Sequence, residues 1–260
     1  MKKTALITGA SSGIGWEFAK IFAQHGYNLV LTARREDRLN TLKNILHKAY
    51  DVEVTCIVCD LTEKTAAEGI VDRVKRLNLT IDVLVNNAGF GVFGKFVDTD
   101  AQRLTDMIQV NVTALVQLTR LLVPGMVERK EGHILNVASM AGFVPGPLMS
   151  VYYASKSFVI SFSEALCNEL KNTSVHVTVL CPGPVKSEFQ QVAYEKDTRA
   201  DSAHIPTAQE TAQFGFEAMQ NKELFAIPGA FNRLMPFLVR VLPRSVVTHI
   251  VRSRQELINN

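Results

Sequence analysis

The strongest constraint on the fold is an alternation: short runs rich in β-branched residues are followed by longer amphipathic runs along the chain. The strand-like runs lie at 4–9, 28–33, 52–59, 81–88, 133–139, 175–181 and 224–228. The helix-like runs lie at about 13–25, 35–48, 64–77, 101–129, 151–171 and 207–221. Several strand-like runs are continuously apolar, which is typical of a sheet covered on both faces. Repeated β-then-α order predicts an α/β fold with one doubly wound, Rossmann-type parallel sheet of about seven strands, in a single domain over 1–260.

The charge distribution argues against a nucleic-acid-binding protein. The formal net charge is +3, but residues 231–260 hold five arginines and a single acid, so the charge sits in this tail. The rest of the chain has no basic face suited to a phosphate backbone. The first ten residues are too short an apolar stretch for a signal peptide, and no run of 18 apolar residues predicts a transmembrane helix.

Cys56 and Cys59 form a CxxC pair, a spacing that metal and redox sites use. The pair lies inside a strand-like run, where residues three apart point to opposite faces. No second CxxC pair supplies further ligands. We therefore expect no metal site and a reduced, cytoplasmic protein.

A glycine-rich turn follows the first strand-like run and precedes a helical one. Glycines let the backbone approach a pyrophosphate, and the free N–H groups of a helix N-terminus favour an anion. The spacing is GxxxGxG, and a tight connection between strand and helix is the alternative interpretation. The residues predicted to contact a dinucleotide here are Gly9, Ser11, Ser12, Gly13, Ile14 and Gly15.

The end of the second strand-like run indicates which dinucleotide. An acid there would bind the ribose 2′-hydroxyl of NAD. The chain instead has Arg34 and Arg35, and Arg34 lies 19 residues after Gly15. A guanidinium suits a 2′-phosphate through charge-assisted hydrogen bonds, so the pattern favours NADP(H). The alternative is that both arginines are solvated residues at a helix start.

Further motifs follow in a fixed order. They are TGASSGIG at 8–15, Asp60-Leu61, NNAG at 86–89, Asn111, Ser139, Tyr152 with Lys156, and Pro182-Gly183. In this order the chain resembles the short-chain dehydrogenase/reductase family in its form of about 250 residues. The resemblance covers residue 4 to about 190. Ser187 stands where the family usually has threonine, and about the last 60 residues match no motif.

The resemblance implies roles for four residues. Tyr152 would be the acid/base, Lys156 would tune it and bind the nicotinamide ribose, and Ser139 would hold the substrate oxygen. The backbone of Asn111 would bind a water that links Lys156 to solvent. The other residues that the resemblance places at the cofactor are Asp60, Leu61, Asn87, Ala88, Gly89, Pro182, Gly183, Val185 and Ser187. It also implies a homodimer or homotetramer built partly on helices 101–129 and 151–171.

The choice of tyrosine depends on the resemblance. Tyr152 and Tyr153 lie four and three residues before Lys156, and both spacings bring side chains together on a helix. The reference pKa of tyrosine, about 10, is too high for fast proton exchange at neutral pH, and a nearby ammonium lowers it. The family pattern YxxxK selects Tyr152. The alternative is a buried aromatic residue beside a solvent-seeking lysine.

The remaining segments predict the substrate side. Loops 90–96 and 140–149 carry Phe, Val, Leu and Met, which indicates an apolar pocket or, alternatively, packing against a lid. Residues 186–223 are polar with weak periodicity, typical of a mobile lid. In the segment 229–260, Pro236 and Pro243 are expected to break the chain into short helices. This segment would dock onto the body or a subunit partner, or, less favoured, touch a membrane surface.

The sequence thus predicts an NADP(H)-dependent oxidoreductase that interconverts a carbonyl and a secondary alcohol on a hydrophobic small molecule. A 3-oxoacyl-thioester reductase is the alternative with the same catalytic residues. A non-catalytic NADP-binding sensor or scaffold is the alternative from another class.

Overall fold

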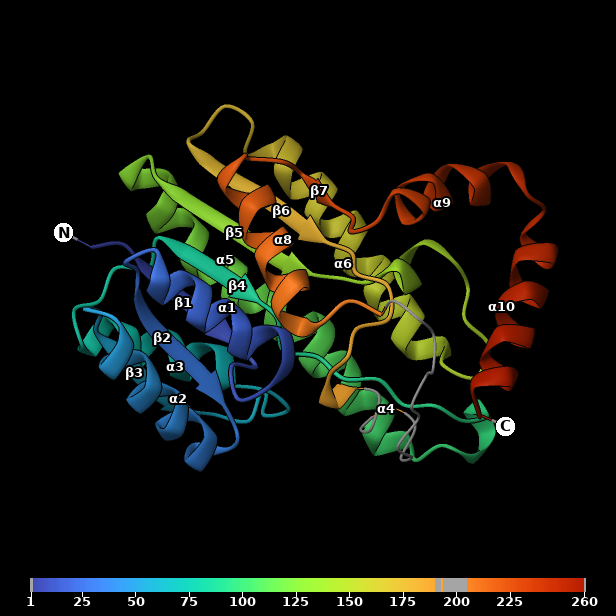
Figure 1. The fold of residues 1–260 in the computed structure, drawn as a ribbon, viewed down its shortest axis with the longest axis horizontal. Coiled ribbons are helices and arrows are strands. Elements are labelled where there is room, and N and C mark those ends of the chain that lie inside the picture. The colour runs from blue at the N-terminus through green and yellow to red at the C-terminus, as the bar shows by residue number, and fades with distance from the viewer. Residues whose placement is uncertain (1, 190–192, 194–204, 260) are drawn as a thin grey trace.

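In the computed structural model, which describes residues 2–189, 193 and 205–259, the strands form one parallel sheet in the order β3-β2-β1-β4-β5-β6-β7 (Figure 1). The strands are β1 (Thr4–Thr8), β2 (Asn28–Ala33), β3 (Val54–Val58), β4 (Val83–Asn86), β5 (Gly132–Val137), β6 (Val175–Leu180) and β7 (Phe225–Ala226). The strand order reverses between β1 and β4, the arrangement of a doubly wound sheet. The predicted fold class is confirmed.

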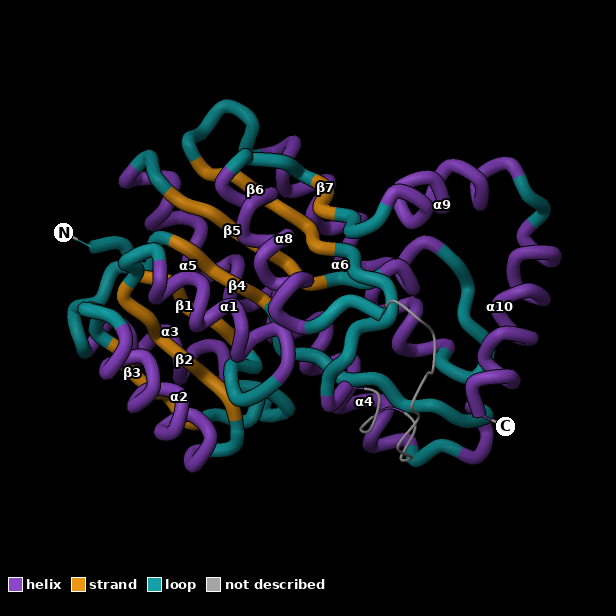
Figure 2. The backbone as a smooth tube through the Cα atoms, viewed as in Figure 1, coloured by secondary structure: helices purple, strands orange, loops and turns teal. Residues whose placement is uncertain are grey.

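Helices cover both faces of this sheet (Figure 2). The α-helices of the described residues are α1 (Gly13–Gln24), α2 (Glu36–Ala49), α3 (Ala66–Arg76), α4 (Ala101–Ile108), α5 (Ala114–Arg129), α6 (Ser150–Glu169), α8 (Ala208–Gln220), α9 (Ala230–Val241) and α10 (Arg244–Asn259). Apolar side chains of α1, α2 and α8, such as Phe18, Leu42 and Phe216, are buried on one face. Those of α3 and α5, such as Ile70 and Leu118, are buried on the other. Burial on both faces explains the continuously apolar strands.

The helix predicted over 101–129 is interrupted by a π-helical turn at Gln109–Thr113. Such turns leave backbone groups outside the regular α-helical pattern and often occur at functional sites. By length and composition the stretch 101–129 could cross a membrane, and within the described residues no other helix passes that test. A core helix also passes it, and here Ala114, Leu118 and Met126 pack against the sheet.

The predicted CxxC pair is split by the sheet. The Cys56 thiol points to the carbonyl of Leu39 in α2, while the Cys59 thiol points to the carbonyl of Ala66 in α3. These helices lie on opposite faces, so the two sulfur atoms cannot act together.

The predicted lid 186–223 needs a correction. Residues 190–192 and 194–204 lie outside the described part of the chain, so the lid stays a prediction there. The helix predicted over 207–221 is confirmed as α8, but the lid prediction is wrong for 208–220. Phe216 and Met219 of α8 are buried in the core formed with α1, because its apolar residues repeat at helical spacing.

The C-terminal segment forms two helices that extend away from the sheet (Figure 1). Pro243 separates α9 from α10, as expected. Pro236 does not break the chain but lies inside α9. A proline removes one N–H donor, and the amphipathic α9 continues through this single loss.

A buried polar network joins the centre of the sheet to the helices behind it. Asn86 at the end of β4 donates from Nδ2 to Oδ1 of Asn136 in β5 at 2.9 Å and to Oγ1 of Thr119 in α5 at 3.1 Å. Asn136 donates in turn to Oγ of Ser163 in α6 at 2.9 Å. All four side chains are buried. The network fixes how α5 and α6 sit on β4 and β5.

We expect Asn136→Ala to lower the free energy of unfolding by about 2 to 3 kcal/mol, because it leaves buried partners unsatisfied. Urea unfolding followed by circular dichroism measures this change. Asn44→Ala, at an exposed position of α2, is the control and should change it by less than about 0.5 kcal/mol. An equal effect of the two substitutions would contradict a structural role for the network.

Candidate active site

A cleft of about 1350 Å³ lies at the carboxyl ends of the strands. Parallel α/β sheets bind ligands at this edge, beside the point where the strand order reverses. One end of the cleft is lined by the glycine turn, Arg34 and Arg35, and the other by apolar residues of α9 and α10. Almost all residues predicted for the site line it. Gly15 and Asn111 are exceptions, and they lie directly behind the wall.

The glycine turn has the shape that a phosphate cradle requires. Gly9 and Gly13 have positive φ angles of 66° and 56°. A Cβ atom on Gly9 would lie 2.9 Å from Asn87 Nδ2, and one on Gly15 would collide with the Gly9 carbonyl. Asn87 holds this contact by donating from Nδ2 to the Thr8 carbonyl at 2.8 Å. The turn therefore leaves its backbone free for a close approach, and a dinucleotide pyrophosphate fits it.

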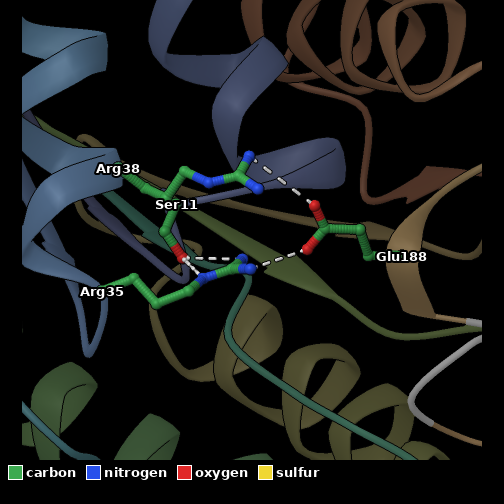
Figure 3. Close-up of polar contacts among 4 residues, drawn as sticks. All are labelled: Ser11, Arg35, Arg38 and Glu188. Carbon is green, nitrogen blue, oxygen red and sulfur yellow. Dashed lines mark hydrogen bonds and ion pairs between the residues drawn. The ribbon is translucent and has the colours of Figure 1, made fainter.

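The end of the cleft beside β2 is rich in guanidinium groups. The Arg34 side chain is 72% exposed, and its Nη1 lies 3.8 Å from Asp60 Oδ2. Arg35 donates from Nε and Nη2 to Ser11 Oγ, both at 3.2 Å, and from Nη1 to Glu188 at 2.9 Å (Figure 3). Asp60 accepts from the backbone N–H of Thr62, and the neighbouring Leu61 is buried. These groups fit an adenosine that carries a 2′-phosphate.

Lys156 is buried in the wall of the cleft. Its Nζ donates to the Val137 carbonyl at 2.8 Å and lies 5.9 Å from the centre of the Tyr152 ring. Burial lowers the pKa of Lys156 to about 8, because the ammonium loses its water shell. The ammonium still predominates at neutral pH and faces the same side of the cleft as Tyr152.

Asn111 lies in the π-helical turn and ties it to the loop after β4. Its Oδ1 accepts from the N–H of Phe90 and its Nδ2 donates to the Phe90 carbonyl, both at 3.0 Å. Nδ2 also donates to Ser155 Oγ in α6 at 3.0 Å. A Cβ on Gly89 would lie 3.0 Å from Asn111 Oδ1 and 3.3 Å from Lys156 Nζ. The structure thus brings Gly89, Asn111 and Lys156 together, and only glycine leaves room between them.

Ser139 follows β5, the strand that ends at Val137. It caps the short 3₁₀ helix Met140–Phe143 by accepting from the Ala141 N–H at 3.1 Å, and it donates to the Pro182 carbonyl at 3.4 Å. Ser139 thus lies in the cleft wall, which Tyr152 of α6 also lines. The other predicted cofactor residues that line the cleft are Ser12, Ile14, Ala88, Gly183, Val185 and Ser187.

The far end of the cleft is apolar. Of the predicted loops, Phe90, Met140, Val144 and Met149 line it, whereas Phe93 packs in the cluster behind. Sequence reasoning missed the wall from the C-terminal helices, which match no motif. The apolar cleft residues of these helices and of the turn between them are Phe231, Met235, Leu238, Val239, Leu242, Val247, Ile250 and Val251.

Tyr153 has a different environment from Tyr152. Its hydroxyl accepts a hydrogen bond from Gln255 Nε2 of α10 at 2.7 Å, which joins α6 to α10. Its ring packs against Gly146 so closely that a Cβ there would collide with it. Burial raises the pKa of Tyr153, although the bond to Gln255 opposes this. A raised pKa makes Tyr153 a poor proton-exchange group at neutral pH.

Comparison with known proteins agrees with this geometry. A family model described as short chain dehydrogenase matches residues 3–198. The chain is 33% identical over 263 residues to a very-long-chain 3-oxoacyl-CoA reductase of Anas platyrhynchos. This match covers 98% of the chain and 80% of that protein. Among the curated relatives compared, the chain spans between 57% and 86% of the relative's length.

Two solved structures are also similar. A short-chain dehydrogenase from Sphingobium yanoikuyae in complex with NADPH superposes with a TM-score of 0.81 at 31% identity, covering 94% of this chain and 97% of that one. A short-chain dehydrogenase/reductase from Burkholderia phymatum in complex with NAD gives 0.80 at 27% identity, covering 92% of each. The chain therefore belongs to the short-chain dehydrogenase/reductase family and is an oxidoreductase that acts on carbonyl and alcohol groups.

Proposed function

We propose that this oxidoreductase uses NADP(H) to interconvert a hydrophobic carbonyl compound and its secondary alcohol, with Tyr152 as the acid/base. The observation that carries the proposal is the buried Lys156 ammonium beside Tyr152. It lies between the glycine turn and the apolar end of the cleft lined by α9 and α10, which we call the apolar chamber. A non-catalytic NADP-binding sensor has no need to bury an ammonium at this position. NADPH binding without turnover on a broad carbonyl panel would favour the sensor.

Four residues of this chain have separate roles in positioning the substrate and in proton transfer. The nicotinamide, when bound, supplies or accepts the hydride. Tyr152 gives its proton to the carbonyl oxygen in reduction and takes it back in oxidation. The Lys156 ammonium favours the phenolate of Tyr152, which makes Tyr152 a stronger acid for reduction and raises the fraction of phenolate that can act as the base in oxidation. Ser139 holds the substrate oxygen beside Tyr152, and the backbone of Asn111 holds the water that returns protons to Lys156.

The cofactor is proposed to be NADP(H) because Arg34 and Arg35 stand where NAD-binding sites of this type have an acid. The residues proposed to hold the pyrophosphate and adenosine are Gly9, Ser11, Ser12, Gly13, Ile14, Gly15, Arg34, Arg35, Asp60 and Leu61. Those proposed for the nicotinamide riboside are Asn87, Ala88, Gly89, Tyr152, Lys156, Pro182, Gly183, Val185 and Ser187. One of the two similar structures holds NADPH and the other NAD, so the preference for NADP(H) is argued from these arginines alone.

Within the hydrophobic carbonyl compounds, a 3-oxoacyl thioester is the substrate class that the relatives favour, since the Anas platyrhynchos protein is named for it. The apolar chamber supports the same class. An acyl chain can run along the cleft residues of α9 and α10 while the 3-oxo group lies near Tyr152.

Assembly and location are proposed from the surface. Ile108, Leu121 and Phe158 leave apolar side chains exposed on α4, α5 and α6, which suits a homodimer or homotetramer built on these helices. The exposed apolar face of α9, which includes Phe237 and Val241, is proposed to contact another copy. A peripheral membrane contact is the alternative, since arginines flank that face.

Four free cysteines support a reduced cytoplasmic setting.

The two adjacent tyrosines give a direct test of the proton-transfer role. Tyr152→Phe should lower kcat by about 10²-fold or more, because it removes the group that transfers the proton. NADPH affinity, measured by fluorescence titration, should stay nearly unchanged. Tyr153→Phe is the matched control and should lower kcat by less than about tenfold, since it loses the bond to Gln255. The reverse order of effects would contradict the assignment.

The buried Lys156 predicts a conflict between stability and activity. Lys156→Met should abolish turnover yet raise the free energy of unfolding at pH 7 by about 1 to 3 kcal/mol, because it removes a desolvated charge. The folded-state pKa, about 8, lies below the unfolded-state value, so the unfolded chain binds more protons between pH 8 and 10.5. Wild-type stability therefore rises with pH there, and the advantage of the variant should shrink. Thermal unfolding at pH 7 and pH 10 measures this, and an advantage that grows with pH would contradict it.

Substrate class is tested with 3-oxoacyl pantetheine thioesters of 4 to about 14 carbons. We expect kcat/KM to rise about tenfold or more with chain length, because each methylene buried in the chamber gains up to about 0.8 kcal/mol. Leu238→Gln, in the chamber wall, should reduce kcat/KM for long chains but not short ones. Leu77→Gln, after α3, is the control and should leave both unchanged. A flat or falling chain-length profile would contradict an acyl chamber.

A further inference from the structure

An unpredicted carboxylate lies at the cofactor end of the cleft. Glu188 Oε2 accepts from Arg35 Nη1 at 2.9 Å, and its Oε1 lies 3.8 Å from Arg38 Nη1 (Figure 3). Ser12 of the glycine turn also acts to lower the pKa of this carboxylate. The two carboxylate oxygens therefore face two different guanidinium groups, and Glu188 occupies an anion site in the cleft.

This anion site shares Arg35 with the region proposed for the cofactor 2′-phosphate. While Nη1 of Arg35 binds Glu188, its Nε and Nη2 bind Ser11 of the glycine turn. A phosphate dianion that bound Arg35 would lie beside the Glu188 carboxylate. Two like charges at such a distance in a partly buried site disfavour each other by several-fold in binding. The carboxylate and the phosphate therefore compete for the same guanidinium.

Glu188 is ionised at neutral pH, so this competition operates there. Burial raises the pKa of Glu188, but the hydrogen bond and charge of Arg35, the hydrogen bond of Ser12 and the charge of Arg38 together bring it below its ordinary value. Its side chain is 39% exposed, so the carboxylate can also leave for water without a large desolvation cost.

The position of Glu188 in the chain connects the two ends of the cofactor site. It follows Ser187, whose Cβ lies 3.5 Å from the place of a Cβ on Gly13. Val185, in the same segment, is buried in the cleft wall beside the proposed nicotinamide region. Binding of Glu188 to Arg35 thus holds the segment 183–189 across the glycine turn.

We propose that the Glu188 carboxylate occupies the 2′-phosphate position as an internal anion, and that NADP(H) binds by displacing it. The inference rests on the proposed NADP(H) specificity. Glu188 is then a specificity-determining residue: it lowers affinity for ligands with a 2′-phosphate and not for those without one. Its displacement releases the segment 183–189 from Arg35.

Binding of two cofactor fragments by the full chain tests this without any turnover. The probes are 2′,5′-ADP and 5′-AMP, which differ in the 2′-phosphate and lack the nicotinamide; affinity is measured by calorimetry. Glu188→Gln should bind 2′,5′-ADP about fivefold more tightly and 5′-AMP within about twofold of wild type. Glu68→Gln, which removes the same charge from the exposed first turn of α3, should leave both affinities within about twofold.

Two further measurements connect the effect to Arg35 and to the segment. In an Arg35→Ala background, Glu188→Gln should change 2′,5′-ADP affinity by less than about twofold, since the shared guanidinium is gone. Hydrogen exchange of the peptide that contains 183–189 should rise in wild type with 2′,5′-ADP but not with 5′-AMP. In Glu188→Gln it should be high before any ligand is added.

The outcomes separate this inference from the proposal beneath it. If Glu188→Gln bound 2′,5′-ADP no better than wild type, or bound both fragments more weakly, Glu188 would be a clamp or a bystander and the inference would be overturned. The NADP(H) proposal would stand as long as wild type prefers 2′,5′-ADP. A wild type that bound both fragments alike would overturn the NADP(H) proposal, and the inference with it.

Discussion

The geometry of the catalytic end depends on the hydrogen bonds of Asn86 and Asn136 across the middle of the sheet. These two amides bind Thr119 of α5 and Ser163 of α6, so two helices are fixed to two neighbouring strands. The helix that leads into α5 carries Asn111, and α6 carries Tyr152 and Lys156. Because apolar packing alone tolerates sliding of a helix on a sheet, directional bonds of this kind specify one position. The residues proposed for proton transfer depend on that position.

A cost in stability accompanies this arrangement. The Lys156 ammonium is buried where its only described hydrogen bond is to the Val137 carbonyl, and burial lowers its pKa. Glycine at position 89 leaves room beside Nζ, since a Cβ there would lie 3.3 Å from it. Strained or desolvated groups persist in proteins chiefly where function requires them. The buried charge therefore supports an enzyme over a binding module.

The two ends of the cleft differ in polarity and charge. The end proposed for the adenosine is polar and holds an excess of guanidinium groups that the Glu188 carboxylate partly neutralises. The end proposed for the substrate is apolar and built largely from α9 and α10, and the bond from Gln255 to Tyr153 joins α10 to the body. Tyr153 is thus a structural anchor for the wall formed by α10, while its neighbour Tyr152 lines the cleft where proton transfer is proposed.

The sequence by itself determined the sheet, the glycine turn and the order of the residues proposed to be catalytic. These features are local: strand and helix periods, glycine spacing and the four-residue step from Tyr152 to Lys156 are visible along the chain. The resemblance, rather than helix geometry, distinguished Tyr152 from Tyr153. The tertiary structure alone decided that α8 belongs to the core, that α9 and α10 line the apolar end of the cleft, and that Glu188 reaches Arg35 and Arg38. The physical reason is distance along the chain: Glu188 lies 153 residues from Arg35 and Gln255 lies 102 from Tyr153, so no local pattern records contacts that only folding creates.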